Sequence, residues 1–359
     1  NRIFRHIIYK TITGTTKMRK KELRTVIIKK NENTLEYLNG ENKSKSKKNT
    51  KDWNTGESLL FYMKNITMSE GLISVIISSL FTDGITPHIP LCFGSSDCDG
   101  ETIILFENLI AGNTEPEYGD YGFITNLQHY HEYAQKNNIK INEEFIDYIV
   151  IQILHTIYIL QDKFSMIHLD IYLRNIYIKD FNNGNKNKPY FNGVIFEKKI
   201  KYLKYLIPGS DPIYLPFDKF KFIVKVGDFG ISTINITTPD NKNIIFYIEY
   251  DGLFDRSIII KNNFPNYPND YRDNHFPDYF FILRDLLQEF GGISELLIRL
   301  NRELPEISDK FYSRYELLKD IDVKKALTPD KILGLGMFDK YRKIPKGIKK
   351  NEIIEIGIN

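Results

Sequence analysis

The sequence predicts an α+β fold with two unequal lobes, a small strand-rich N-terminal lobe and a larger, mostly helical C-terminal lobe. Two short apolar stretches rich in β-branched residues, 25–29 and 102–106, predict strands in the first part of the chain. A Gly-, Glu- and Pro-rich stretch at residues 111–122 predicts a linker after them. The strongest helical patterns all follow that linker. A strand-rich start followed by a helix-rich remainder is typical of an α+β arrangement.

Composition is that of a folded protein without a strong charge bias. The chain has 359 residues, 42% hydrophobic and 26% charged, with a formal net charge of +3. This charge is too small to indicate nucleic acid as a partner. No stretch approaches the roughly 20 apolar residues of a membrane span. Cys92 and Cys98 are too few for a disulfide framework and lack a second pair of zinc ligands, so a reducing compartment is expected.

Two segments after the linker carry clear helical patterns. In residues 142–161 apolar side chains share one face, Asn142 can cap the N-terminus, and two glutamates suit its positive end. Residues 279–290 predict a second helix. The earlier segment 59–81 has mixed apolar spacing and predicts one or two helices.

Two polar stretches are expected to lie outside the core. The Lys-, Ser- and Asn-rich residues 39–51 predict a solvated loop. Strands are predicted at residues 176–178 and 222–226, and the Asn- and Lys-rich stretch between them, about 180–220, is expected to be an insertion.

Two short motifs carry the chemistry. In residues 166–175 an Asp stands two residues after a His, and an Asn stands five residues after that Asp. Farther on, Asp-Phe-Gly at residues 228–230 leaves a predicted strand. Either motif alone is a weak signal, since an isolated Asp-Phe-Gly is usually a turn. In this order and setting, the pair resembles the catalytic loop and the metal-binding triplet of protein kinases.

The resemblance runs from about residue 26 to residue 290 and implies a bilobal protein-kinase-like fold. It also implies a role for each polar residue of the motifs. Asp170 would orient the substrate hydroxyl and accept its proton, whereas Asn175 and Asp228 would supply oxygen ligands to Mg²⁺. Arg174 is a further candidate catalytic residue, because its place directly before the Asn resembles many tyrosine kinases.

The first lobe would supply the phosphate-binding ion pair of the family. Lys29, at the end of the first predicted strand, resembles the phosphate-binding lysine, and Lys30 is its rival in the next register. The carboxylate that holds this lysine on the phosphates is predicted to be Glu70, with Glu57 as the alternative.

Residues 103–109 resemble the last strand of the first lobe and the hinge after it. Phe106 would then close the back of the adenine pocket, and Glu107 to Leu109 would offer backbone groups to the base. The hinge places the lobe boundary between residues 1–109 and residues 110–359.

The sequence also departs from the family pattern. Gly14 is the one glycine where the phosphate-binding loop belongs, whereas the family has three, and Gly is the residue that lets backbone approach phosphate closely. Leu169 replaces the Arg that pairs with a phosphorylated activation segment. In the family, the Asp that begins the central helix of the second lobe supports the catalytic loop. Asp278 has that position, although it could also be a plain helix cap.

The expected function is that of an active kinase that uses ATP and Mg²⁺ on a protein substrate, with serine or threonine favoured over tyrosine. Two alternatives stay open. One is a pseudokinase that acts as a binding or scaffold module, and the other is a kinase-fold enzyme acting on a small molecule. The Asn-, Lys- and Ile-rich composition resembles kinases of large cytoplasmic DNA viruses, so the host cytoplasm or the virion is the expected location. The sequence does not indicate an oligomeric state.

Overall fold

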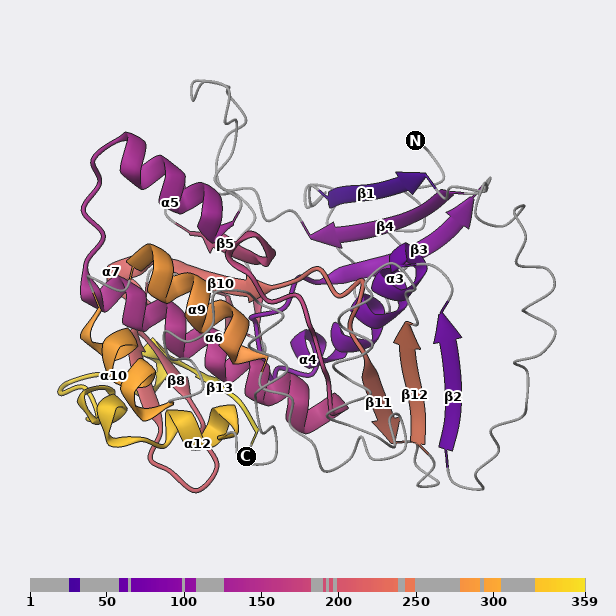
Figure 1. The fold of residues 1–359 in the computed structure, drawn as a ribbon. Helices are drawn as coiled ribbons and strands as arrows, with labels where there is room; N and C mark the ends of the chain where they lie inside the picture. The colour runs from indigo at the N-terminus through magenta and orange to yellow at the C-terminus, as the bar shows by residue number, and fades with distance from the viewer. Residues whose placement is uncertain are drawn as a thin grey trace.

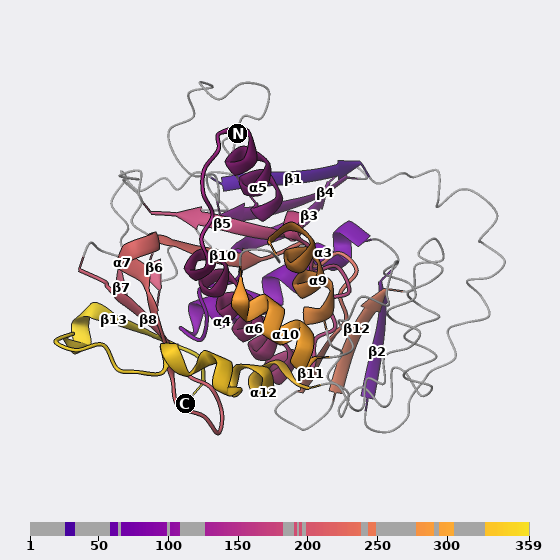
Figure 2. The same ribbon diagram turned by 60° about the vertical axis from the view of Figure 1, so that its left-hand side comes forward.

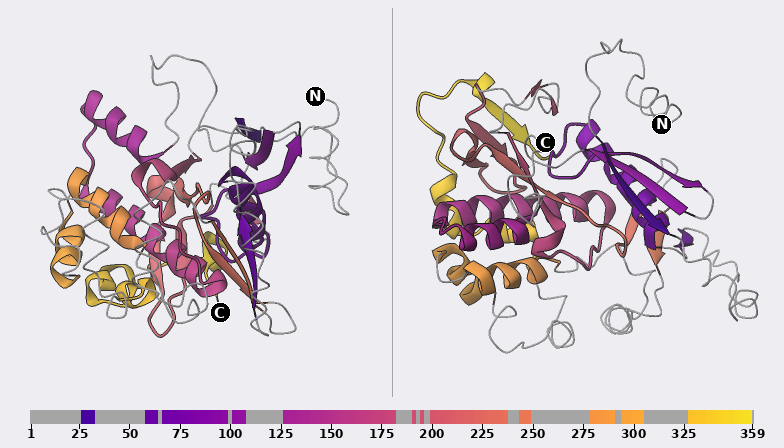
Figure 3. Two further views of the ribbon diagram at one scale, coloured as in Figure 1. Left: turned by 45° about the vertical axis from the view of Figure 1, so that its right-hand side comes forward. Right: turned by 90° about the horizontal axis from the view of Figure 1, so that it is seen from above.

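The computed structural model describes a mixed α/β protein with several small sheets. Figure 1 shows the strands β1, β4 and β3 on one side and the helices α6, α9, α10 and α12 on the other, and both views of Figure 3 keep this separation. The described residues are 26–32, 58–63, 66–98, 101–107, 126–181, 190–191, 194–195, 199–237, 243–248, 278–290, 294–304 and 327–358. The predicted loop 39–51 and linker 111–122 lie outside these ranges.

An antiparallel sheet, here called the N-terminal sheet, has the strand order β1-β4-β3. Its strands are β1 (Val26–Glu32), β4 (Glu101–Glu107) and β3 (Cys92–Cys98). The first two confirm the strands predicted from β-branched residues. Helix α3 (Ile66–Ile77) packs against this sheet, and the short α4 (Ser79–Thr82) follows it.

The helices predicted over residues 59–81 begin later than expected. Residues Ser58–Met63 form strand β2, so the prediction was wrong for the start of this segment. β2 pairs in parallel with β12 (Asn243–Ile248), which pairs in turn with β11 (Ile234–Thr237). The partner strand lies far along the chain, so the local spacing of apolar residues did not reveal it.

The long helix α6 (Glu143–Phe164) confirms the strongest helical prediction. The Asn142 side chain accepts a hydrogen bond from the Phe145 N–H at 2.9 Å, as expected of a cap. The helix is buried on all sides in its middle, because α9, α12 and β10 pack around it. Other helices of this part are α5 (Leu127–Lys136), α9 (Tyr279–Phe290), α10 (Glu295–Glu303) and α12 (Pro329–Leu333). Helix α9 has the bounds that the sequence predicted, whereas α5 was not predicted.

The stretch expected as a polar insertion contributes to the core. Within it lie β6 (Tyr190–Phe191), β7 (Val194–Ile195), β8 (Tyr202–Tyr205), β9 (Ile213–Pro216) and α7 (Phe217–Phe220). Strand β13 (Ile353–Ile356) pairs in parallel with β8, and Figure 2 shows the two together. Leu203, Tyr205 and Leu215 are fully buried. An apolar alternation hidden among Lys and Asn residues therefore builds a three-stranded sheet, whose third strand comes from the end of the described chain.

A two-stranded antiparallel sheet carries the chemical motifs. It consists of β5 (Ile176–Asp180) and β10 (Phe222–Val226), and the turn η1 (Leu173–Asn175) leads into β5. The turns η4 (Gly336–Tyr341) and η5 (Lys350–Glu352) precede β13. Within the described part of the chain, no helix is both long and apolar enough to cross a membrane.

Candidate functional site

The loop between α6 and β5 holds the Asp of the first motif in a fixed position. Asp170 is 8% exposed. The Asn175 amide donates to the Asp170 backbone oxygen at 2.8 Å and to its carboxylate Oδ2 at 2.9 Å. The Arg174 guanidinium Nη2 lies 3.2 Å from both carboxylate oxygens. The turn η1 places both partners within reach, so three of the predicted residues come together.

The two motifs, which lie far apart in the sequence, meet at His168 and Gly227. The His168 Nε2 lies 3.2 Å from the Gly227 carbonyl oxygen, and the Gly227 N–H donates to the backbone carbonyl oxygen of Asn175 at 3.0 Å. The His168 Nδ1 accepts from the Asp170 N–H at 3.3 Å, so the Nε2–H donates to Gly227. Burial lowers the pKa of His168, and the carboxylates of Asp170 and Asp228 oppose that shift, so both act on the same ring.

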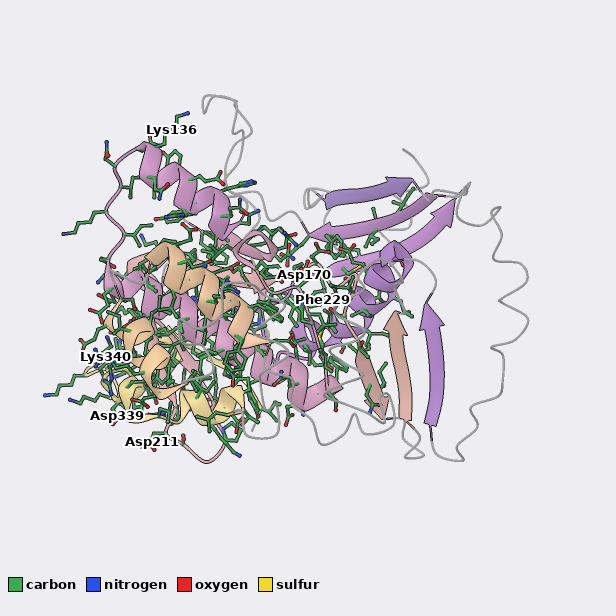
Figure 4. All side chains as sticks on the ribbon, in the orientation of Figure 1. Lys136, Asp170, Asp211, Phe229, Asp339 and Lys340 are labelled. Carbon is green, nitrogen blue, oxygen red and sulfur yellow. The ribbon has the colours of Figure 1, made fainter. Side chains whose placement is uncertain are left out.

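The residues after Gly227 adopt a constrained arrangement. Asp228 has a φ of 64° and Leu169, in the other motif, has a φ of 65°, in the left-handed region that non-glycine residues seldom adopt. Phe229 is 1% exposed and its ring centroid lies 5.0 Å from that of His168. It shares a buried cluster with Ile73 and other residues of α3 and α6. Figure 4 shows Asp170 and Phe229 close together where the helical part meets the strands.

Asp278, directly before α9, holds the backbone of the loop between α6 and β5. Its carboxylate accepts hydrogen bonds from the N–H groups of His168 and Leu169, both at 2.9 Å. The predicted contact between Asp278 and the loop of residues 166–175 is therefore present. Asp278 is 1% exposed, and burial raises its pKa to about 7, although the two backbone N–H groups favour the charged form.

The predicted phosphate-binding pair is described in part. Glu70 lies on α3 and is 3% exposed. The register pairs Lys29 with the buried Ile104 and Lys30 with Ile103. The ion pair between Lys29 and Glu70 stays a prediction, because the side chains of β1 lie outside the described residues. Three further predicted or alternative site residues lie outside them as well: Gly14, Glu57 and Leu109.

The end of β4 holds an ion pair that sequence reasoning missed. Phe106 is half-buried, and the next residue, Glu107, extends its carboxylate toward β10. The Lys225 Nζ lies 2.5 Å from the Glu107 Oε1, and the side chain of Lys225 is only 2% exposed. The available signal was a lysine within the otherwise apolar strand Phe222–Val226. Burial lowers the pKa of Lys225, and the Glu107 carboxylate opposes that shift.

The donor set near Gly227 fits Mg²⁺ better than a transition metal. Within the described ranges, no group of three or more His, Cys, Asp or Glu residues could hold a metal ion. Mg²⁺ is bound by one or two carboxylates together with phosphate oxygens and waters, and needs no larger cluster. Asp228 offers a carboxylate. Both hydrogen bonds from the Asn175 side chain use its NH₂ group, so its amide oxygen is not committed by them.

No protein-family model matches the chain, and no curated protein matches its sequence. The geometry around Asp170 and Asp228 therefore carries the functional conclusion.

Proposed function

We propose that the chain is a protein kinase of bilobal fold that transfers the γ-phosphoryl group of ATP to a protein hydroxyl, serine or threonine in preference to tyrosine. The observation that carries the proposal is the contact between the two motifs. His168 and Asn175 of the loop both hydrogen-bond to Gly227, directly before the Asp-Phe-Gly segment. Two weak motifs that meet through specific hydrogen bonds are a much stronger signal than either motif alone.

Each residue in this arrangement suits phosphoryl transfer, which depends on positioning and charge neutralisation. Asp170 is held by Arg174 and Asn175, so its carboxylate is oriented to accept the proton of an incoming hydroxyl. Asp228 and Asn175 would hold Mg²⁺, which neutralises phosphate charge when bound. Neutral His168 buttresses both segments and takes no proton from the substrate.

The wider arrangement supports a bilobal fold. The N-terminal sheet and α3 lie on one side of the motifs, and the helices around α6 lie on the other (Figure 1). Ligands bind preferentially where such parts meet. The proposed setting is the cytoplasm of an infected cell or the virion of a large DNA virus, for which the support is the Asn-, Lys- and Ile-rich composition.

The test is transfer of radiolabelled γ-phosphate from ATP to a panel of proteins, followed by phosphoamino-acid analysis. Asp170→Asn is the matched control, because it keeps the size of the side chain and removes its basicity. Labelled phosphoserine or phosphothreonine that depends on Asp170 supports the proposal. Nucleotide binding without transfer indicates a pseudokinase, and transfer only to small molecules indicates the small-molecule enzyme. Absence of both binding and transfer overturns the kinase proposal.

A further inference from the structure

The strand that leads to Asp228 is held by a segment that directly follows the N-terminal helices. The Val226 N–H donates to the His88 oxygen at 2.9 Å, and the His88 Nδ1 lies 2.8 Å from the Val224 oxygen. His88 is fully buried, and burial lowers its pKa to about 3, so the ring is neutral. Its Nδ1–H donates to Val224, and its Nε2 accepts from the Tyr205 hydroxyl at 2.8 Å.

Lys225 adds a buried charge to this contact. Its Nζ donates to the Ile89 oxygen at 2.9 Å and to the Glu107 carboxylate at 2.5 Å, and it lies 4.9 Å from the centroid of the Phe81 ring. The same carboxylate oxygen of Glu107 accepts from the Leu91 N–H at 2.9 Å. The ammonium group thus reaches across from β10 to groups that belong to the N-terminal part of the chain.

A buried ion pair is a poor source of stability, because the cost of desolvating both charges offsets most of their attraction. The best-attested use of such pairs is to specify one geometry over its alternatives. Glu107 is the last residue of β4, and Lys225 stands three residues before Asp228. The pair therefore joins the end of the strand proposed to lead to the adenine base and the segment proposed to hold Mg²⁺.

We propose that the ion pair between Glu107 and Lys225 is a positioning element that couples ATP binding at the end of β4 to Mg²⁺ binding at Asp228. This inference rests on the proposed kinase function. Neither side chain is proposed to contact the reacting atoms. With the pair intact, the base subsite and the metal subsite are held at one fixed distance from each other. Without it, the two subsites bind their ligands more independently.

The test measures this coupling directly. The dissociation constant of ATP is measured for the whole chain with Mg²⁺ and with EDTA, and the ratio of the two reports how much the metal strengthens nucleotide binding. The variant is Glu107→Gln with Lys225→Met, which removes both charges at similar volume, and the Gln oxygen can still accept from Leu91. We expect the ratio to fall at least about fivefold, a typical size for coupling between sites, with little change in the thermal unfolding midpoint.

A matched control breaks an ion pair away from the site, in which an exposed lysine contacts a buried carboxylate. Lys340 lies 2.6 Å from the Asp147 carboxylate, which is fully buried, and Figure 4 shows Lys340 far from Asp170. Lys340→Met should lower the unfolding midpoint and leave the ratio unchanged. If the double variant does not fold, Lys225→Arg replaces it, since the planar guanidinium keeps the charge but not the geometry of the ammonium.

The outcomes separate the inference from the function on which it rests. A folded double variant with the wild-type ratio overturns the inference, because the pair is then merely structural, and leaves the kinase proposal standing. The same holds for Lys225→Arg in its place. Wild-type protein that does not bind ATP overturns both. A reduced ratio in the site variant together with an unchanged ratio in Lys340→Met supports the coupling.

Discussion

Two residues of the site, Leu169 and Asp228, hold a left-handed backbone, one in each motif. For a residue with a side chain this conformation costs on the order of 1–3 kcal/mol, and it persists only where the surroundings determine it. Two hydrogen bonds hold these backbones in place, one from the His168 ring to the Gly227 carbonyl oxygen and one from the Leu169 N–H to the Asp278 carboxylate. Strain of this kind gathers at functional sites, so its position here agrees with the proposed chemistry.

Asp228→Asn should abolish turnover and leave the fold nearly intact. The substitution keeps the shape of a half-buried side chain and removes one negative charge from the proposed metal ligands. We expect the rate of phosphoryl transfer to fall about 10²-fold or more, worth at least ~2.7 kcal/mol of transition-state stabilisation. Single-turnover transfer in excess Mg²⁺, measured beside thermal unfolding, checks this. Equal rates in both proteins would show that Asp228 does not hold the metal.

Asp278→Asn should change how stability depends on pH. Burial raises the pKa of Asp278 in the folded protein to about 7, from its ordinary value of 3.8. The folded state therefore binds the proton more tightly, and the stabilisation due to the protonated Asp278 is fully present below about pH 4. It is lost as pH rises toward about 7. The unfolding free energy of the wild type minus that of Asp278→Asn should accordingly decrease as pH rises over this window and stay constant above it.

Denaturant unfolding of both proteins at several pH values between 4 and 8 measures this difference. Subtracting one protein from the other cancels contributions from groups they share, including the buried His88 and His155, whose lowered pKa values act in the opposite direction. A difference that does not vary with pH would mean that Asp278 remains charged in the folded state.

At the scale of elements, helix α3 lies unusually close to strand β3. A Cβ atom added at Gly71 would lie 2.7 Å from the Ser95 Cβ and 2.8 Å from its Oγ, closer than side chains approach one another. Gly71 is adjacent to Glu70, the predicted partner of the phosphate-binding lysine. The absence of a side chain at Gly71 therefore sets the distance of this carboxylate from the N-terminal sheet.

Gly71→Ala should destabilise the protein although alanine favours helix. The gain in helix propensity is at most ~1 kcal/mol, whereas overpacking a rigid contact costs ~1–3 kcal/mol. Adding Ser95→Gly removes both atoms that the new methyl group would meet, so the double variant should recover part of the loss. A double-mutant cycle by denaturant unfolding, with Ser95→Gly alone as the control, measures this coupling. Strictly additive effects would contradict the contact.

At the scale of the whole molecule, the last described strand closes the structure. Strand β13 completes the sheet with β8 and β9, and the Gly357 N–H then donates to the Ile85 oxygen at 2.9 Å. Ile85 directly follows the N-terminal helices, so this end of the chain joins the two parts of the molecule. Ile358 packs at the edge of the buried cluster that contains Phe229.

Ile356→Ala should therefore be costly although it lies in the last described strand. Ile356 is fully buried, and truncation of a buried isoleucine to alanine costs ~2–5 kcal/mol. The control is Ile344→Ala, because Ile344 is 73% exposed and its truncation should stay within ~0.5 kcal/mol. Denaturant unfolding compares the two variants. Equal effects would mean that β13 does not contribute to the core.

The sequence by itself determined the features that depend on neighbouring residues. The start of α6 followed from helical spacing and the Asn142 cap, the bounds of α9 from helical spacing, and the strands β1, β4, β5 and β10 from their apolar runs. The order of the two motifs and the residues Asp170, Asn175 and Asp228 were also legible locally. These signals act over a few residues, because hydrophobic periodicity, helix capping and β-branching are properties of neighbouring residues.

Tertiary structure alone decided the features whose partners lie far apart in the chain. The pairing of β2 with β12 and of β8 with β13 turned an expected helix and an expected insertion into sheet. The ion pair of Glu107 and Lys225 likewise joins residues that are 118 positions apart in the sequence. A strand leaves N–H and C=O groups unpaired until another strand binds to it, and a charged lysine in a core is costly unless a carboxylate pairs with it. The folded structure supplies both the partner strand and the carboxylate, and the residues adjacent in sequence do not indicate where either comes from.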